Sequence, residues 1–378
     1  MNIIILGLAS LLTDISTEMV YPLLPMFLTQ TLGASPAILG FIEGIAESVA
    51  SLLRVFSGYI SDRLGRRKPL AIAGYAASTL GKVFLVVAEA WPTVLAGRFV
   101  DRFGKGVRTA PRDALIADSA DPARRGRAYG LHRAMDSLGA TLGVVVAIVL
   151  LRSGAANLRA IFLWSLIPAA LGVGVLFFAR DVRSHRVGTH APVLRWSVLP
   201  AKLRAYMLVV FLFTLGNSSN QFLLLRAQNL GVATAAVLVL YLVFNITYAV
   251  VAYPAGRLSD WVGRRTLLVA GYALYGLVYL GFGLASSPGS LWLLFPVYGL
   301  YMGVFDGVEK ALVADLAPTS IRATAIGFHA TLVGIGLLPA SLLAGWMWTS
   351  FGPAVPFYFG GVLGCAAALA VLVVLGKS

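Results

Sequence analysis

Charged residues are scarce in this sequence. Only 12% of its 378 residues are Asp, Glu, Lys or Arg, whereas 58% are hydrophobic. A soluble domain carries about 25% charged residues, so water is not the main solvent of this chain. Apolar runs of about twenty residues, each long enough to cross roughly 30 Å of hydrocarbon, recur throughout the sequence. The composition therefore predicts an all-α polytopic membrane protein.

Cysteine is nearly absent as well, and so are the common catalytic motifs. Cys365 is the one cysteine, which excludes an internal disulfide and a cysteine metal cluster. The sequence contains no H-E-x-x-H, no G-x-S-x-G and no phosphate loop. We therefore expect a protein that is not an enzyme and that has no cofactor and no metal site.

The N-terminus lacks the basic region and the cleavage site of a signal peptide, so we interpret it as the first membrane helix. Apolar runs bounded by Gly, Pro and charged clusters predict twelve helices. Six lie near 5–29, 37–60, 69–88, 93–117, 128–150 and 160–179, and six near 205–227, 232–257, 267–285, 291–315, 324–348 and 355–375.

Lys and Arg are distributed unevenly between the loops. Seventeen lie in alternate loops, namely 61–69, 119–127, 180–204, 258–266, 317–323 and 376–378. The other loops contain only Arg152 and Arg159. Because cytoplasmic loops are enriched in Lys and Arg, both termini are predicted to be cytoplasmic in a cell inner membrane. The same rule explains the net charge of +14 without a nucleic-acid partner.

The longest polar interruption, 180–204, is predicted to be a cytoplasmic linker between two six-helix bundles, 1–179 and 205–378. The two halves resemble each other in sequence. The segment DRLGRR at 62–67 is echoed by DWVGRR 198 residues later, and ALIAD at 114–118 by ALVAD 197 residues later. Matching registers of this kind indicate an internal repeat.

Residues 58–70 (GYISDRLGRRKPL) resemble the loop between helices 2 and 3 of the major facilitator superfamily, G-x-L-x-D-R-x-G-R-R-x-x-L, and residues 256–268 repeat the pattern. Residues 102–110 (RFGKGVRTA) resemble the family's helix 4 motif, R-x-x-x-G-x-x-x-A. The resemblance, closest to prokaryotic drug:proton antiporters, implies twelve transmembrane helices in two pseudo-symmetric halves with a substrate site at midplane. It also implies a conformational motif made of Gly58, Asp62, Arg63, Gly65, Arg66, Asp260, Gly263 and Arg264.

Charged residues also occur inside the predicted spans, where each costs on the order of 3 kcal/mol. In the fourth span they share an arc of roughly 140° at helical periodicity, which cannot face lipid. Acidic pairs one turn apart stand in the first and second spans, Asp14 with Glu18 and Glu43 with Glu47. The predicted substrate and proton pathway comprises Asp14, Glu18, Arg102, Arg108, Arg112, Asp113, His132, Asp136, Asn217, Gln221, Asp306, Glu309 and Lys310.

Two interpretations of these charges stay open. They form a transport pathway, with Asp14, Glu18 and Asp136 as candidate proton carriers, or a structural ion-pair network that only assembles the bundle. In the second half, Asp306, Glu309 and Lys310 are predicted to share one helix face.

The main prediction is a proton-coupled antiporter that exports a small organic compound by alternating access. One alternative is a proton symporter that imports an organic anion or a zwitterionic metabolite, favoured by the net-positive fourth span. Another is a non-transporting membrane sensor, which would normally carry a soluble output domain. The expected partners are a small-molecule substrate, protons and the lipid bilayer, and we expect a monomer.

Overall fold

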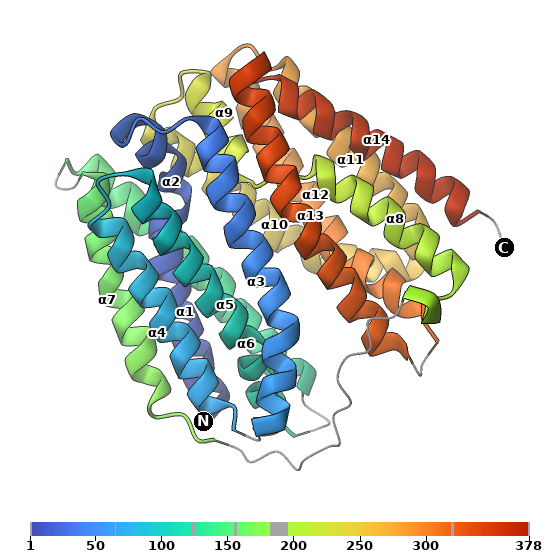
Figure 1. Cartoon of the computed structure of the whole chain (residues 1–378), viewed down its shortest axis with the longest axis horizontal. Helices are drawn as coiled ribbons and strands as arrows, with labels where there is room; N and C mark the ends of the chain where they lie inside the picture. The colour runs from blue at the N-terminus through green and yellow to red at the C-terminus, as the bar shows by residue number, and fades with distance from the viewer. Residues whose placement is uncertain are drawn as a thin grey trace. The chain divides into compact units, whose positions relative to one another are not determined.

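The computed structural model describes residues 2–64, 66–121, 125–154, 157–181, 196–318 and 321–376. Within these ranges every regular element is a helix, and Figure 1 labels the main helices along the chain. The predicted all-α membrane fold is confirmed.

The first six spans follow the predicted ranges to within several residues. The first begins as α1 (Asn2–Val20) and continues through the short turns η1 (Tyr21–Leu23), α2 (Leu24–Met26) and η2 (Phe27–Thr31). Pro22 and Pro25 interrupt it because proline has no backbone N–H for the helical ladder. The next spans are α3 (Pro36–Leu64), α4 (Lys68–Val86), α5 (Trp91–Ser119), α6 (Arg125–Arg152) and α7 (Leu158–Leu176).

The second six spans begin with a broken helix. α8 (Ala201–Gly216) and α9 (Gln221–Asn229) cross the membrane together, where the sequence predicts one continuous helix. The remaining spans are α10 (Thr234–Val262), α11 (Arg264–Leu284), α12 (Pro288–Leu316), α13 (Arg322–Phe351) and α14 (Val355–Val374). Gly263 separates α10 from α11 with φ +91°, a backbone conformation that glycine adopts without steric cost.

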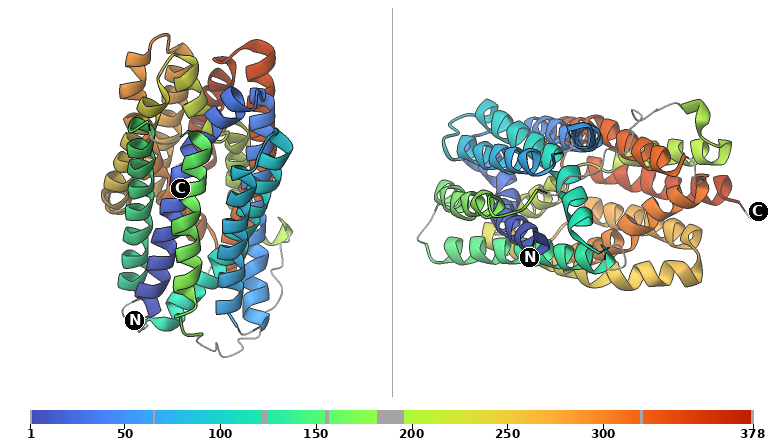
Figure 2. Two further views of the ribbon diagram at one scale, coloured as in Figure 1. Left: turned by 90° about the vertical axis from the view of Figure 1, so that its left-hand side faces the viewer. Right: turned by 90° about the horizontal axis from the view of Figure 1, so that it is seen from below.

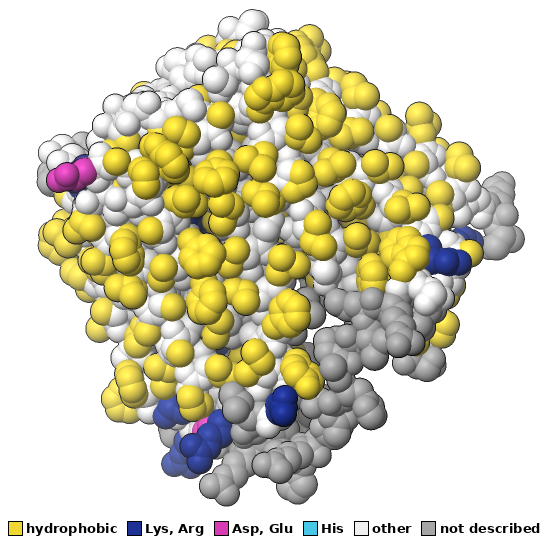
Figure 3. All heavy atoms as spheres, in the orientation of Figure 1, with side chains coloured by type: hydrophobic (Ala, Val, Ile, Leu, Met, Phe, Trp, Pro, Cys, Tyr) yellow, Lys and Arg dark blue, Asp and Glu magenta, His cyan; other side chains and the backbone are white. Residues whose placement is uncertain are grey.

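Eleven runs of described residues are long and apolar enough to cross a membrane. α5 is not among them, although its 29 residues exceed the required length, because its charged side chains make it too polar. Counted with α5, the chain has twelve membrane spans among its described residues. Figure 3 shows hydrophobic side chains spread over the visible face, while Lys and Arg gather near its edges, as expected for a surface in contact with lipid.

The helices form two compact units. Unit 1 comprises Met1–Ala34 and Ile45–Ala191, and unit 2 comprises Ser35–Gly44 and Pro192–Ser378. The first turns of α3 therefore belong to unit 2 by their contacts. Gly40 packs so closely on α13 that an added Cβ would lie 2.1 Å from the carbonyl oxygen of Ser341.

In unit 1, α1 packs between α6 and α7, and α4 packs along α5 (Figure 2). Two reciprocal glycine contacts bring the backbones of α4 and α5 together. A Cβ on Gly104 would lie 2.4 Å from the Gly74 carbonyl oxygen, and a Cβ on Gly97 would lie 2.7 Å from that of Gly81. Small residues at both positions permit this close approach, which places the polar face of α5 against α4.

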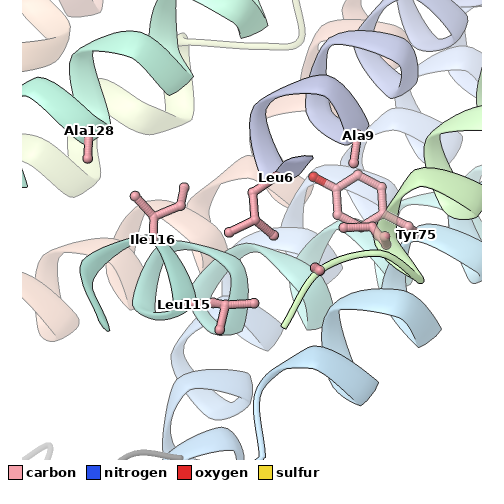
Figure 4. Close-up of a cluster of buried hydrophobic side chains, with 8 residues drawn as sticks. Leu6, Ala9, Tyr75, Leu115, Ile116 and Ala128 are labelled. Carbon is pink, nitrogen blue, oxygen red and sulfur yellow. The ribbon is translucent and has the colours of Figure 1, made fainter. Parts of the chain in front are cut away.

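A cluster of buried hydrophobic side chains joins the helices of unit 1 at the end where α1 begins and α5 ends. Figure 4 shows Leu6 and Ala9 of α1 beside Tyr75 of α4 and Leu115 and Ile116 of α5. All five are at most 1% exposed. The cluster supplies apolar packing directly beside the charged residues of α5.

Unit 2 has an aromatic interior instead. α11 packs against α14, and α10 against α12. Six of its described tyrosines are each at most 1% exposed, namely Tyr206, Tyr272, Tyr275, Tyr279, Tyr298 and Tyr301. The rings of Tyr275 and Tyr279 stack with centroids 4.1 Å apart, closer than the roughly 4.5 to 7 Å usual for ring pairs.

Candidate functional site

The polar face of α5 lies inside unit 1. Arg98, Asp101, Arg102 and Arg108 are all between 3% and 5% exposed. Because a charge in lipid is costly, this burial is what the single-face pattern predicts. The question that the structure answers is which groups each charge contacts.

Arg102 forms an ion pair with Glu47 of α3, with 2.9 Å between Nη2 and Oε1. Its guanidinium also lies over the Tyr21 ring, 5.7 Å from the centroid, and Arg98 approaches the same ring at 5.6 Å. Arg98 in turn lies 3.4 Å from the Asp101 carboxylate. Charge pairing and cation–π contact together stabilise these guanidinium groups away from water.

Arg108 is held without a carboxylate. Its Nη1 donates a hydrogen bond to Ser78 Oγ at 2.5 Å, and its guanidinium lies 4.4 Å from the centroid of the Tyr75 ring. Both partners belong to α4. Among the described residues, no Asp or Glu oxygen lies within ion-pair distance of Arg108.

Arg112 binds its neighbour in sequence. Its Nη2 donates to Asp113 Oδ1 at 2.8 Å, and its Nη1 donates to Ser10 Oγ of α1 at 3.1 Å. Asp113 is 44% exposed at its side chain, and its backbone carbonyl accepts a hydrogen bond from Tyr129. The carboxylate that pairs with Arg112 is therefore Asp113.

Asp14 stands half-buried in α1. It forms no hydrogen bond and no ion pair with any other residue that the structure describes. The charged groups that act on it most strongly are Asp136, Arg108 and Lys105. Glu18, one turn further along α1, is also half-buried. It lies beside α6, where a Cβ on Gly143 would be 3.0 Å from the Glu18 Cβ.

In α6, His132 and Asp136 stand one turn apart and form a pair. His132 Nδ1 lies 3.4 Å from Asp136 Oδ2, and the histidine is 4% exposed. Gly139 and Gly143 of the same helix pack on the α1 backbone, where an added Cβ would lie 2.5 Å and 2.4 Å from the carbonyl oxygens of Leu11 and Ile15. These glycines set α6 against the helix that carries Asp14 and Glu18.

In unit 2, Glu309 of α12 has two polar neighbours. It accepts a hydrogen bond from Tyr272 at 3.1 Å, and its Oε2 lies 3.3 Å from His329 Nε2 of α13. Glu309 is 9% exposed, whereas Lys310 is exposed. Although the sequence predicts a common helix face, Glu309 and Lys310 therefore have different environments. The side chain of Asp306 lies outside the described residues.

Asn217 and Gln221 flank the break between α8 and α9. Asn217 ends α8, and Gln221, which begins α9, is 0% exposed. Between them, Asn220 accepts a hydrogen bond from the Tyr298 hydroxyl at 2.7 Å. The break thus places polar groups inside unit 2, where unwound backbone needs partners.

The repeated loop motif holds an ion pair in each unit. Arg67 binds Asp118 in unit 1, and Arg264 binds Asp315 at 2.5 Å in unit 2. Both partners in unit 2 stand 197 residues after those in unit 1. The sequence analysis assigned Arg66 to the motif instead, because the Asp and Gly residues of the two loops align at an offset of 198. Arg66 is exposed.

The other motif residues differ in what the structure describes. Gly58 faces α5 without strain, since an added Cβ would lie 3.4 Å from that of Ala110. Arg63 is exposed. Gly65 and the side chains of Asp62 and Asp260 lie outside the described residues. Asp181 Oδ1 instead accepts hydrogen bonds from the backbone N–H groups of residues 67 and 68 at the start of α4.

Besides Arg67, two further buried cations were missed by the sequence analysis. Lys82 of α4 is 2% exposed and Arg226 of α9 is 6% exposed. Arg226 donates to the carbonyl oxygens of Phe282 and Ala285 at the end of α11, at 3.2 Å and 2.8 Å, an anchor at a helix C-terminus. Each of these two cations is isolated in an apolar run of the sequence, and this isolation could have marked it as a candidate site residue.

The 197-residue repeat relates charged side chains of unit 1 to aromatic side chains of unit 2. The corresponding pairs are Lys82 and Tyr279, Arg98 and Phe295, Asp101 and Tyr298, and Arg108 and Phe305. The two repeats therefore share a fold but differ in the chemistry of their interiors.

Twelve spans, a repeated loop motif and buried charges define a multi-pass membrane transporter. The chain belongs to the Major Facilitator Superfamily, whose sequence model matches residues 6–225 and 206–378. It is 37% identical to an MFS-type transporter of Methanocaldococcus jannaschii over 98% of this chain and 94% of that protein. It is 25% identical to the multidrug resistance protein MdtH of Proteus mirabilis over 94% of this chain and 90% of that protein.

Solved structures share the fold. The nucleoside transporter NupG matches with a TM-score of 0.87 at 13% identity, over 99% of this chain and 100% of that one. A POT family transporter in complex with 5-aminolevulinic acid matches with a TM-score of 0.80 at 13% identity, over 98% and 95%. At these identities the likeness concerns the fold alone.

Proposed function

We propose that this transporter is a proton-coupled antiporter that exports a small organic compound. The observation that carries the proposal is Asp14, a carboxylate inside the first span with no hydrogen bond or ion pair to another described residue. Such a group can alternate between its protonated and ionised forms without breaking an ion pair. It stands among Asp136, Arg108 and Lys105, so a proton that it gains or loses changes the field around them.

The direction of transport is inferred from a relative. The multidrug resistance protein MdtH of Proteus mirabilis matches most of this chain at 25% identity, and drug resistance in its name supports export over import. The candidate proton carriers proposed from sequence, Asp14, Glu18 and Asp136, carry over to this function.

A second candidate function is proton symport of an organic anion into the cell. It is favoured by Arg108, whose guanidinium contacts a hydroxyl and an aromatic ring but no carboxylate among the described residues. A cation of this kind suits a substrate that brings its own negative charge.

Flux into proteoliposomes separates the two functions. The purified chain is reconstituted, and uptake of labelled cationic, zwitterionic and anionic compounds is measured with the lumen made acidic or alkaline. Antiport accumulates substrate when the lumen is acidic, because protons leave as substrate enters, whereas symport requires an alkaline lumen. A protonophore, which removes the pH gradient, serves as the control. Equal uptake with an acidic and an alkaline lumen would contradict proton coupling.

Topology and organisation complete the proposal. We propose a cell inner membrane location with both termini cytoplasmic, a monomer, and two transport domains, 1–179 and 205–378, joined by the cytoplasmic linker 180–204. The basis is the loop count of 17 Lys and Arg against 2. Reporter fusions after Ser378 and within 180–204 that indicated an extracytoplasmic location would contradict this orientation.

A further inference from the structure

Lys82 is buried inside unit 1, where its ammonium group donates to two hydroxyl groups. It belongs to α4, its side chain is 2% exposed, and its Nζ donates to Ser16 Oγ at 2.7 Å and to Thr17 Oγ1 at 3.1 Å. Both hydroxyls come from α1. No carboxylate among the described residues lies within ion-pair distance of Nζ.

The two hydroxyls are oriented to accept from Lys82. Ser16 donates its own proton to the Ser165 carbonyl oxygen at 2.6 Å, and Thr17 donates to the Thr13 carbonyl oxygen at 2.9 Å. Each hydroxyl has one proton, so only its lone pairs are available to the lysine. An ammonium group has three N–H donors, and these contacts use two of them.

The carboxylates that act on Lys82 form no ion pair with its Nζ. Asp101, the carboxylate that acts most strongly on Lys82, lies 3.4 Å from Arg98. Asp14, which also acts on Lys82, forms no ion pair with any described residue. A buried ammonium without a counter-ion is costly, so an anionic group placed beside Nζ would be strongly favoured.

We propose that Lys82 binds the oxyanion of a transported organic acid, a carboxylate or a phosphate ester, through its third N–H. This inference rests on the proposed transport function and adds the chemical class of the substrate. Arg108 lies on the same side of the network, since it contacts Ser78, one turn before Lys82 on α4, and it also has no carboxylate partner among the described residues. Two such cations fit an oxyanion better than a cationic drug.

Equilibrium binding to the full-length chain in neutral detergent tests the proposal. The probes are benzoate, phenyl phosphate and inorganic phosphate, with benzamide as the uncharged match for benzoate and chloride as the ionic-strength control. Thermal unfolding followed by tryptophan fluorescence reports binding, because a ligand that binds the folded state raises Tm. The variants are Lys82→Met and Lys82→Gln, which are neutral, Lys82→Arg, which keeps the charge, and Lys202→Met at an exposed position as the matched control.

We expect at least one oxyanion to raise Tm of the wild type and of Lys202→Met, while benzamide does not. Both neutral variants should bind that probe about tenfold more weakly or worse, equivalent to about 1.4 kcal/mol, and Lys82→Arg should retain most of the affinity. If no oxyanion binds the wild type better than benzamide does, or if the neutral variants bind as the wild type does, the proposal is overturned. No pH gradient is used, so this outcome is independent of whether transport is proton antiport.

Discussion

The Arg102 guanidinium of α5 forms its ion pair with Glu47 of α3, across 2.9 Å. Arg102 is 5% exposed at its side chain and Glu47 is 30% exposed. The pair therefore joins two neighbouring helices of unit 1 at a position largely shielded from solvent. An ion pair in such a place is maintained by both partners, since either one alone would be left as a buried charge.

Replacing Glu47 by Gln should lower the free energy of unfolding by about 2 kcal/mol, because Arg102 loses its counter-ion in a largely apolar setting. Unfolding of the purified chain by a denaturing detergent measures the change. The double variant Glu47→Gln with Arg102→Gln should recover more than half of the loss. A double variant as unstable as the sum of the two single variants would show that the pair contributes nothing as a pair.

Gly104→Ala should destabilise the chain by about 1 to 3 kcal/mol, the usual cost of overpacking. The added Cβ would meet the backbone carbonyl of Gly74 at 2.4 Å and the Ser78 backbone nitrogen at 2.7 Å, and neither atom can rotate away. Gly174→Ala in α7 is the control, because nothing lies within 4 Å of its Cβ position. Equal thermal stability of the two variants would contradict the close packing of α4 on α5.

Asp14→Asn should abolish accumulation driven by a pH gradient while leaving substrate exchange at equal concentrations in place, because the variant cannot release a proton. The same flux assay in proteoliposomes, run with and without the gradient, measures both activities. Glu89→Gln, which neutralises an exposed carboxylate, is the control and should behave as the wild type. If Asp14→Asn still accumulates substrate against its gradient, the proton carrier must be another group, with Glu18 and Asp136 next to be tested.

Glu309→Gln tests the acidic group of unit 2. The amide oxygen can still accept the Tyr272 hydrogen bond, so we expect the variant to fold, but it removes the negative charge 3.3 Å from His329. Transport should fall at least about tenfold if the charge is required, as interactions of charged groups of this kind are worth about 1.5 to 3 kcal/mol. Tyr272→Phe removes only the hydrogen bond and should reduce the transport rate less than Glu309→Gln does. If Glu309→Gln transports substrate at the wild-type rate, the Glu309 carboxylate has a structural role only.

Arg226→Met should destabilise unit 2 with little direct effect on transport chemistry. The guanidinium donates to the carbonyls of Phe282, Gly283 and Ala285, and its loss leaves these helix-end acceptors without their donor, at a cost of about 3 kcal/mol. Thermal unfolding measures the change, and Arg152→Met at an exposed position is the control. Reduced flux at unchanged stability would instead place Arg226 in the transport pathway.

The register of the two loop motifs shows how far sequence comparison reaches. The echo of Asp62 in Asp260 gives an offset of 198, whereas that of Asp118 in Asp315 gives 197. The ion pairs follow the second register, so Arg67, not Arg66, occupies the position that Arg264 occupies in the other unit. A one-residue insertion within a loop cannot be placed by pattern alone, because either arginine satisfies the motif.

Glu43 and Glu47 illustrate the same limit within a helix. Their spacing of one turn places both on one face of α3. The structure gives them separate partners, since Glu43 accepts a hydrogen bond from Ser219 at 3.3 Å and Glu47 binds Arg102. The spacing of residues along a helix fixes the direction of a side chain but not the helix that it meets.

The amino-acid sequence was enough to predict the membrane class, the twelve spans and the repeat, because hydrophobic length and local motifs act over short stretches of chain. It also determined that the charges of α5 face inward, since lipid excludes them. The fold was needed to assign a partner to each charge, to identify the cations that have no carboxylate beside them among the described residues, and to place Lys82 against hydroxyls of α1. These contacts join residues far apart in sequence, and their distances depend on how closely glycine and other small residues allow the helices to approach.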